Sequence, residues 1–175
     1  MILFGKLLKR IYRITGAKYY LDIRPQAFIT NWFFQKILGN NHEIEHPIHF
    51  TCLVAGYQNI IFNKKNIPIL QCFALSGGCY FGITNGSTLE IGDDTIWAWN
   101  VNIQTGNHDL IDRNKYEVKS VKIGNNCWIG GNVTILPGIT LGDNVTVGAN
   151  SVVTKSFPSN VVIAGVPAKV IRELN

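Results

Sequence analysis

Charged side chains are scarce in this 175-residue chain, where Asp, Glu, Lys and Arg together make up only 15% of the residues. The hydrophobic share of 46% is ordinary for a globular protein, so the composition excludes an intrinsically disordered chain, and the length fits one domain. The low charge indicates flat surfaces that are covered, for instance by copies of the same chain. The net charge of +5 favours an anionic partner, such as a phosphate-bearing cofactor, a nucleic acid or a membrane surface, without choosing among them.

The chain also lacks paired cysteines and long apolar runs. Its four cysteines show no CxxC spacing and no signal peptide is visible, which predicts reduced thiols in a soluble, cytoplasmic protein. No apolar run approaches the roughly 20 residues of a membrane span. The nearest one, residues 67–83, is interrupted by Pro68 and a glycine pair.

The first 45 residues form a region apart from the rest. Within residues 1–20, apolar residues recur at helical spacing, and basic residues lie off that stripe. Such a helix either packs on the main body or a neighbouring subunit, or lies on an anionic membrane. A second apolar stretch, residues 27–38, is also predicted to be helical and to end at Gly39.

From residue 89 the sequence repeats with a period of six. Pairs of inward-facing residues separated by one outward residue alternate with turn formers, which indicates a short strand and a turn in every repeat. The expected inward positions are Leu89, Ile91, Thr95, Trp97, Val101, Ile103, Val121, Ile123, Cys127, Ile129, Val133, Ile135, Ile139, Leu141, Val145, Val147, Ser151 and Val153. This pattern is typical of a parallel β-helix, whose coils bury their inner faces by stacking.

Two parts of the repeat are irregular. Residues 46–88 keep the phase loosely and are expected to form irregular first coils, with pairs such as Phe73 and Leu75 in strands. Trp97 is large for an inward position, so either the coil bulges or its ring turns outward with Trp99. The sharpest break separates Ile103 from Ile123, and we expect the polar residues 104–120 to leave the coil as a loop.

That loop contains "TGNHDL", and the chain continues with "NNCWIG", "GANSVVTK" and "AGVPAKVIR". Over residues 46–175 these motifs closely resemble the bacterial hexapeptide-repeat acyltransferases, especially the maltose and galactoside O-acetyltransferase branch and its surface-polysaccharide relatives. The resemblance implies a mainly β protein, a left-handed parallel β-helix that assembles as a homotrimer. It also implies acetyl-CoA in a groove between subunits, with the histidine loop reaching across. The hand comes from the resemblance alone.

His108 is the candidate catalytic residue. A neutral imidazole can take the proton that an acceptor hydroxyl loses as it attacks a thioester. Its other nitrogen would be held by Asp109, by Asp112 or by a main-chain carbonyl. A backbone N–H at Gly130 or Gly131 is the candidate donor to the developing oxyanion. A covalent route through Cys127 competes, but packing explains the cysteines better.

The resemblance also implies the residues that bind acetyl-CoA. Thr154 and Lys155 match contacts to the nucleotide end, and Lys169 and Arg172 can supply charge for its phosphates. Trp128 matches the aromatic residue beside the pantetheine arm. Small residues that let the cofactor approach the backbone are expected at Gly130, Gly131 and Ala149.

The acceptor pocket departs from that of the disaccharide enzymes. Gly78 stands where that branch has an acceptor-contacting Asn, so a simple sugar is doubtful as substrate. The candidate acceptor contacts are Asn85, Trp99 and Asp109. Trp99 could stack on a saccharide, although coil packing or a trimer contact explains it equally well.

The leading function is therefore acetyl-CoA-dependent O-acetylation of a sugar in surface polysaccharide biosynthesis, by direct transfer and without a metal. N-acetylation of an amino sugar is a close variant, and the acyl chain length is left open. A zinc-dependent carbonic anhydrase needs three convergent histidines, whereas only His108 lies within the regular coils. A non-catalytic β-helix would have no use for the loop histidine, and the scattered basic residues argue against nucleic acid binding.

Overall fold

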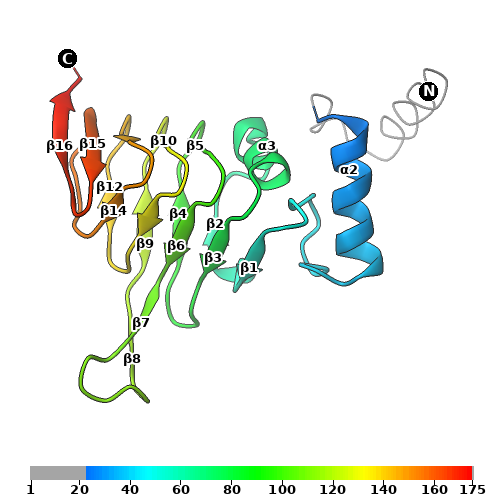
Figure 1. The fold of residues 1–175 in the computed structure, drawn as a ribbon, viewed down its shortest axis with the longest axis horizontal. Helices are drawn as coiled ribbons and strands as arrows, with labels where there is room; N and C mark the ends of the chain where they lie inside the picture. Colours follow the sequence, from blue (N-terminus) through cyan, green and yellow to red (C-terminus); the bar gives the residue numbers. More distant parts are fainter. Residues whose placement is uncertain (1–22, 175) are drawn as a thin grey trace.

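Short strands alternate with tight corners and assemble into three sheets, in which the strands are parallel except for the last one, β16 (Figure 1). The structure is a computed structural model that describes residues 23–174. Its strands are β1 (Leu53–Ala55), β2 (Ile60–Ile61), β3 (Tyr80–Gly82), β4 (Leu89–Ile91), β5 (Ile96–Trp97), β6 (Asn102–Gln104), β7 (Gly106–His108), β8 (Tyr116–Val118), β9 (Val121–Ile123), β10 (Trp128–Ile129), β11 (Thr134–Ile135), β12 (Thr140–Leu141), β13 (Thr146–Val147), β14 (Val152–Val153), β15 (Val161–Gly165) and β16 (Ala168–Glu173).

Successive strands of the repeat belong to different sheets, so the chain winds round three faces. The first sheet has the order β1-β3-β6-β11-β14, the second β5-β10-β13-β15-β16 and the third β2-β4-β9-β12. Trp128 pairs with Thr146, 18 residues later, which is three hexapeptides per coil. Ile96 pairs with Trp128 across 32 residues, so that coil carries 14 extra residues. This register defines a parallel β-helix.

The inward side chains form one core along the prism axis. Every inward position predicted from the hexapeptide pattern is buried, including the polar Thr95 and Ser151. Trp97 also points inward, with its ring centroid 4.9 Å from that of Phe73 and 5.5 Å from that of Phe81. The outward orientation of Trp97 is therefore wrong, because Phe73 and Phe81 widen the core enough to hold an indole. Each such buried side chain contributes roughly 1.5–3 kcal/mol relative to an exposed one.

The corners explain why the repeat needs Gly and Asn. A Cβ on Gly124 would lie 2.5 Å from the carbonyl oxygen of Gly142 in the next coil, so stacking at this spacing excludes a side chain there. Asn100, Asn132 and Asn150 all adopt positive φ. Their side-chain amides form a ladder along one prism edge, with Nδ2···Oδ1 distances of 3.0 and 3.1 Å. Asn tolerates this backbone conformation better than most residues.

The expected loop leaves the prism as a β-hairpin (Figure 1). Strands β7 and β8 pair antiparallel, with Gly106 opposite Val118 and His108 opposite Tyr116. The hairpin is anchored at its base by the buried Thr105, whose Oγ1 accepts hydrogen bonds from Thr84 N at 2.9 Å and from Ser87 Oγ at 2.7 Å. The protruding element is thus itself regular and is fixed to the preceding coil.

The first coils contain a helix that the hexapeptide pattern did not predict. Residues 67–75 form α3 (Ile67–Leu75), so the expected strand with Phe73 and Leu75 is wrong. Asn66 caps this helix by accepting a hydrogen bond from Ile69 N at 3.2 Å, and Pro68 favours its first turn. Since β5 ends the second sheet, α3 covers the end of the core beside Trp97. A short 3₁₀ turn, Tyr57–Asn59, precedes β2.

The helix predicted over residues 27–38 is confirmed. It comprises α2 (Pro25–Trp32) and a π-helical turn, Phe33–Ile37, followed by Gly39 with positive φ. Asn31 fixes α2 to the body, because its Nδ2 donates to Ala74 O of α3 at 2.8 Å. The amphipathic segment predicted for residues 1–20 lies outside the described residues. Between residues 23 and 174, no helix is both long and apolar enough to cross a membrane.

Candidate active site

His108 sits at the end of β7, on the exposed side of the hairpin. Its Nδ1 lies 2.7 Å from the carbonyl oxygen of Arg113, and its ring packs on Tyr116 with a centroid distance of 4.3 Å. A carbonyl only accepts hydrogen bonds, so Nδ1 must carry the proton. In the neutral imidazole, Nε2 then keeps its lone pair and faces away from the loop. The geometry leaves a base at Nε2.

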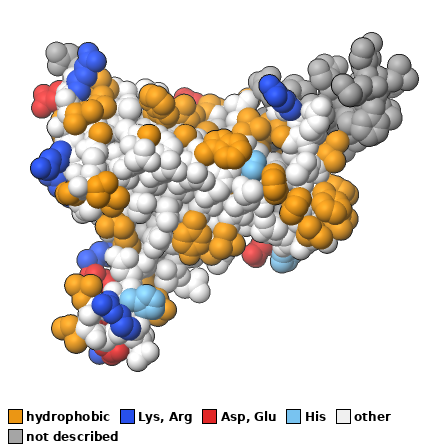
Figure 2. Space-filling model, viewed as in Figure 1, with side chains coloured by type: hydrophobic (Ala, Val, Ile, Leu, Met, Phe, Trp, Pro, Cys, Tyr) orange, Lys and Arg blue, Asp and Glu red, His pale blue; other side chains and the backbone are white. Residues whose placement is uncertain are grey.

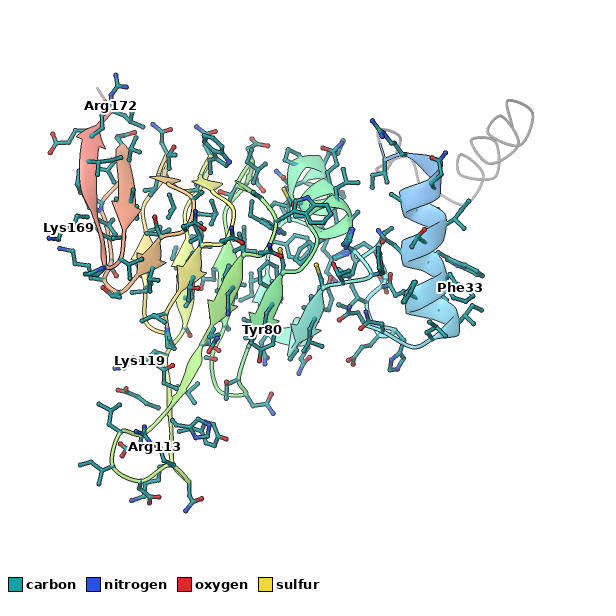
Figure 3. All side chains as sticks on the ribbon, in the orientation of Figure 1. Phe33, Tyr80, Arg113, Lys119, Lys169 and Arg172 are labelled. Atoms are coloured by element: carbon teal, nitrogen blue, oxygen red, sulfur yellow. The ribbon has the colours of Figure 1, made fainter. Side chains whose placement is uncertain are left out.

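The tip of the hairpin is shaped by Asp109. Its Oδ1 accepts hydrogen bonds from Ile111 N and Asp112 N, each at 2.8 Å, and these bonds lower the pKa of Asp109. Arg113 closes the tip by donating from Nη1 to Asp109 O at 2.9 Å (Figure 3). Among the partners expected for the imidazole, the structure selects a main-chain carbonyl, and Asp109 instead holds the loop that supplies it.

One prism edge, between the second and first sheets, carries three of the predicted residues in successive coils. Trp99, Gly131 and Ala149 are joined through the ladder, because Asn132 N donates to Trp99 O at 3.0 Å and Asn150 N to Gly131 O at 2.9 Å. A Cβ on Gly131 would meet nothing closer than 3.5 Å, so this position is open. We call Trp99, Gly131 and Ala149 together the small-residue edge, because Gly131 and Ala149, the two positions next to Trp99 along it, carry no bulky side chain.

Gly130 has a different role from the one that the sequence predicted. Its N–H donates to Val147 O at 2.8 Å, so it is not available to an oxyanion. A Cβ at Gly130 would lie 2.7 Å from Ala149 N, so coil stacking requires glycine here, and the expected closeness of Gly130 to the cofactor stays a prediction. The N–H of Gly131, in contrast, has no acceptor among the described residues. Of the two candidate oxyanion donors, only Gly131 remains.

The other expected acetyl-CoA residues are exposed. Trp128 points outward from β10 and is flanked in register by Ile96 and Thr146. Thr154 and Lys155 follow β14, and the Lys155 ammonium lies 5.5 Å from the centre of the Phe157 ring.

The remaining two cations lie on the last strand, at one end of the prism. Lys169 and Arg172 are on β16, which pairs antiparallel with β15. Lys169 lies toward the β15–β16 turn and Arg172 toward the chain end (Figure 3). Lys and Arg side chains gather at this end and on the hairpin (Figure 2).

Asn85 lies in an exposed turn close to the base of the hairpin, next to Thr84. Its Oδ1 accepts only a long hydrogen bond, 3.5 Å, from Asn59 Nδ2. Within residues 23–174, neither a hydrogen bond nor a ring contact joins His108 to Asn85, to Trp99 or to the expected cofactor residues. Among the described residues, the candidate base thus has no such contact with the candidate binding residues that lie outside the hairpin.

The cysteines and histidines offer no competing centre. All four cysteines are buried free thiols, and burial raises the pKa of Cys127, whose Sγ donates to Gly142 O at 3.2 Å. A thiol held in this way is a poor nucleophile. In the described part of the chain, no three His, Cys, Asp or Glu side chains are grouped to hold a metal ion.

Sequence reasoning missed two parts of the site. The first is the main-chain carbonyl of Arg113. The sequence could not point to it, because every residue has a main-chain carbonyl. Tyr116 could have been found from hairpin pairing, since it lies directly opposite His108.

Known proteins are similar to this chain in sequence and fold. The family model "Bacterial transferase hexapeptide (six repeats)" matches residues 120–155. The putative lipopolysaccharide biosynthesis O-acetyl transferase WbbJ of Escherichia coli (strain K12) is 42% identical, over 97% of this chain and 94% of its own length. The galactoside O-acetyltransferase of the same strain is 47% identical over 79% of this chain. This chain spans only 64% of that relative.

A solved galactoside acetyltransferase in complex with coenzyme A aligns with a TM-score of 0.50 and 37% identity, covering 59% of this chain and 57% of that one. Together with the parallel strand pairing of the coils, these likenesses confirm the parallel β-helix expected from the hexapeptide pattern and the left hand that the resemblance implied.

Proposed function

This chain belongs to the bacterial hexapeptide-repeat acetyltransferases, a family of enzymes, and on that premise we propose that it transfers the acetyl group of acetyl-CoA to a sugar hydroxyl. The observation that carries the proposal is the Nδ1–H bond of His108 to Arg113 O, which leaves Nε2 as a base. The similarity to a putative lipopolysaccharide O-acetyl transferase along 94% of that protein supports a surface-polysaccharide acceptor.

In the proposed reaction, His108 Nε2 takes the proton of the acceptor hydroxyl as its oxygen attacks the thioester carbonyl carbon. Acetyl-CoA supplies the activated acyl group. The imidazolium formed is stabilised by its hydrogen bond to Arg113 O, and Nε2 then returns the proton to the departing sulfur. The free N–H of Gly131 is the candidate donor to the carbonyl oxygen as negative charge develops on it. Atoms and charge balance without a covalent enzyme intermediate.

The residues present fit an acyl-CoA. The small-residue edge is open at Gly131 and bears only a methyl group at Ala149, so an extended pantetheine arm can approach the backbone there. Trp128, on the strand β10 that precedes Gly131, offers an exposed aromatic face. Cationic Lys155, Lys169 and Arg172 suit the phosphate end. We assign the donor contacts to these residues together with Thr154.

A homotrimer would complete this site. His108 projects on a hairpin away from its own prism, so it can reach the small-residue edge of a neighbouring copy (Figure 1). Exposed Ile61 and Ile96 on the outer sheet faces, together with the low charge of the chain, support burial between copies. Each active site would then combine His108 of one subunit with Gly131 of the next.

The central experiment follows release of free CoA from acetyl-CoA with a panel of methyl glycosides of neutral sugars and amino sugars. Acceptor-dependent release, with an acetyl ester on the product, supports the proposal. An acetamide product would instead favour the N-acetyl variant, and no release with any acceptor would contradict acetyl transfer. Cys127→Ser should leave turnover unchanged, because the thiol is buried and takes no part.

Mixing subunits tests the shared site. Variants His108→Ala and Gly131→Trp should each be inactive, the second because an indole blocks the edge. When they are unfolded together and refolded as mixed trimers, some interfaces pair an intact histidine with an intact edge, so part of the activity should return. No recovery, with mixed trimers present by native mass spectrometry, would place both residues of a site in one chain.

We further propose that this protein works in the cytoplasm, in peripheral contact with the inner membrane face. Support comes from the α2 patch, formed by the exposed side chains Ile29, Trp32, Phe33, Ile37 and Leu38. Phe33 points away from the prism (Figure 3), and the exposed Arg24 and Lys36 lie close to the patch residues in the sequence. Aromatic and basic residues together suit an anionic bilayer surface. The double variant Trp32→Ser, Phe33→Ser should lose co-sedimentation with phosphatidylglycerol vesicles; retained binding would refute the contact.

A further inference from the structure

A second histidine lies outside the site described above, at the end of the small-residue edge. The ring of His49 stacks on Phe50 at 4.7 Å with 28° between the planes, and its centroid lies 5.1 Å from the Trp99 ring, edge to face. Trp99 itself is 56% exposed, so the indole keeps an open surface although His49 contacts it. This places a partly buried polar ring directly beside an accessible aromatic one.

The hydrogen bonds of His49 fix its tautomer. Gly78 N donates to Thr51 Oγ1 at 2.8 Å, and Thr51 N donates to His49 Nδ1 at 3.3 Å. Since Nδ1 accepts that N–H, it carries no proton, and the Thr51 hydroxyl 2.8 Å away donates to it as well. The proton of the neutral ring is therefore on Nε2, which has no acceptor among residues 23–174. Partial burial lowers the pKa of His49 and so maintains the neutral form.

The backbone around the His49 imidazole is closely packed. A Cβ on Gly77 would lie 2.6 Å from His49 Cε1 and 2.7 Å from Nδ1, so only glycine lets the ring lie against that backbone. The neighbouring Phe50 is held from both sides of its peptide, by Asn31 Oδ1 at 3.1 Å and by Asn40 Nδ2 at 2.8 Å. A donor N–H held in a fixed direction needs little reordering when it binds a ligand.

From this arrangement we propose that Trp99 and His49 form a pyranose-binding subsite for the acceptor sugar, with the indole face against the C–H face of the ring and His49 Nε2–H donating to a sugar hydroxyl. Ligand sites combine apolar, aromatic lining with a few placed polar groups in this way. Because Trp99 continues the edge of Gly131 and Ala149, the subsite adjoins the donor groove. The inference rests on the proposed function and adds His49 to it.

The two histidines thus present opposite chemistry at the same ring atom. His108 Nε2 has a lone pair and accepts a proton, whereas His49 Nε2 bears a hydrogen and can only donate. Substituting His49 should weaken acceptor binding without removing the base. Substituting His108 should do the reverse.

The test is steady-state kinetics with the methyl glycoside of highest turnover. Trp99→Ala should raise the acceptor KM about tenfold or more, the loss expected for a good aromatic contact, and leave the KM for acetyl-CoA unchanged within about twofold. His49→Phe should raise the acceptor KM several-fold, because it keeps the ring and removes the donor. Trp99→Phe should recover part of the loss. Ile67→Ala, which removes an exposed apolar side chain from α3, is the control and should change neither KM.

Three outcomes would overturn the subsite: an unchanged acceptor KM, an equal rise in both KM values, or a changed oligomeric state of Trp99→Ala by light scattering. Each leaves the proposed function standing if the wild type turns over. Should the wild type acetylate nothing, the proposed function fails, and calorimetric titration of the same glycosides into His108→Ala decides the subsite separately. Binding that Trp99→Ala abolishes supports it, and no binding refutes it.

Discussion

The stacked coils and the hairpin differ in how their residues are held in place. In the coils, each predicted inward residue is buried, and corner glycines such as Gly124 and Gly142 fit against the backbone of the next turn. In the hairpin, residues 106–118 include no buried side chain, and the tip is ordered by turn hydrogen bonds around Asp109. Burial is the main source of folding free energy, so the coils should set stability while the hairpin sets chemistry. Substitutions in the two regions should therefore separate the two properties.

The largest separation is expected at His108. His108→Ala should lower kcat by about 100- to 10,000-fold, the usual worth of a positioned base, while the melting temperature stays the same because the side chain is exposed. The measurement is CoA release alongside differential scanning fluorimetry. The variant should also keep its thermal stabilisation by acetyl-CoA.

His42→Ala is the matched control, since it removes another exposed histidine from outside the hairpin. It should leave kcat unaffected. Full turnover by His108→Ala would refute the base assignment and leave the fold untouched.

A matched aliphatic pair tests stability from the other side. Ile135 on β11 is fully buried, whereas Ile111 at the hairpin tip is 97% exposed. Ile135→Ala should reduce the free energy of unfolding by about 2–5 kcal/mol through lost burial and the cavity left behind. Ile111→Ala should change it by less than about 0.5 kcal/mol. Urea denaturation followed by circular dichroism measures both, and equal losses would mean that the hairpin belongs to the cooperative core.

The same contrast explains what the sequence could predict. In the coils, one local rule repeats, and even Thr95 and Ser151 at inward positions are buried as expected. At α3 the rule failed, because apolar Phe73 and Leu75 suit a helix or a strand equally. The deciding signals were Asn66 and Pro68, a cap and a first-turn proline. His108 was located because it interrupts the repeat.

The partners of the functional residues were harder to predict. The imidazole of His108 is held by a main-chain carbonyl, which any residue at position 113 would supply. His49 reaches Trp99 from another coil, and no spacing rule joins the two positions. Gly130 and Gly131 are adjacent and identical in type, yet among residues 23–174 only the N–H of Gly131 lacks an acceptor. Such differences depend on which group the folded backbone has already paired.

A buried histidine supplies a pH-dependent contrast to the hairpin. Burial, with Lys64 as a smaller cause, lowers the pKa of His46 to about 4 from an unfolded value of 6.5. The folded state thus favours the neutral ring, so this contribution is complete above pH 6.5 and is lost as the pH falls toward 4. A pKa lowered by about 2.5 corresponds to about 3 kcal/mol of unfolding free energy.

His46→Phe should remove that contribution, since Phe suits the neighbouring ring of Phe73 and does not titrate. The difference in unfolding free energy between wild type and variant should therefore shift by up to about 3 kcal/mol between pH 7 and pH 4, in favour of the variant at low pH. A difference that is constant with pH would show that folding does not lower the pKa of His46.

The smallest effect is expected at Asp109, whose Oδ1 shapes the tip of the hairpin and whose contact with the acceptor remains a prediction from the sequence. Asp109→Asn keeps an oxygen that can accept from Ile111 N and Asp112 N but removes the negative charge that strengthens both bonds. The Arg113 carbonyl should then hold His108 less firmly, and kcat should fall about three- to tenfold, with the KM for acetyl-CoA and the melting temperature unchanged. A rise in the acceptor KM as well would support the expected contact between Asp109 and the acceptor. Glu117→Gln, which removes a charge from β8 rather than from the tip, should leave kcat as it is.

Since the turn bonds lower the pKa of Asp109, the wild type should keep its tip ordered to a lower pH than an ordinary carboxylate would allow. A drop in melting temperature with Asp109→Asn would show that the hairpin tip contributes to global stability. Stability would then not be set by the coils alone.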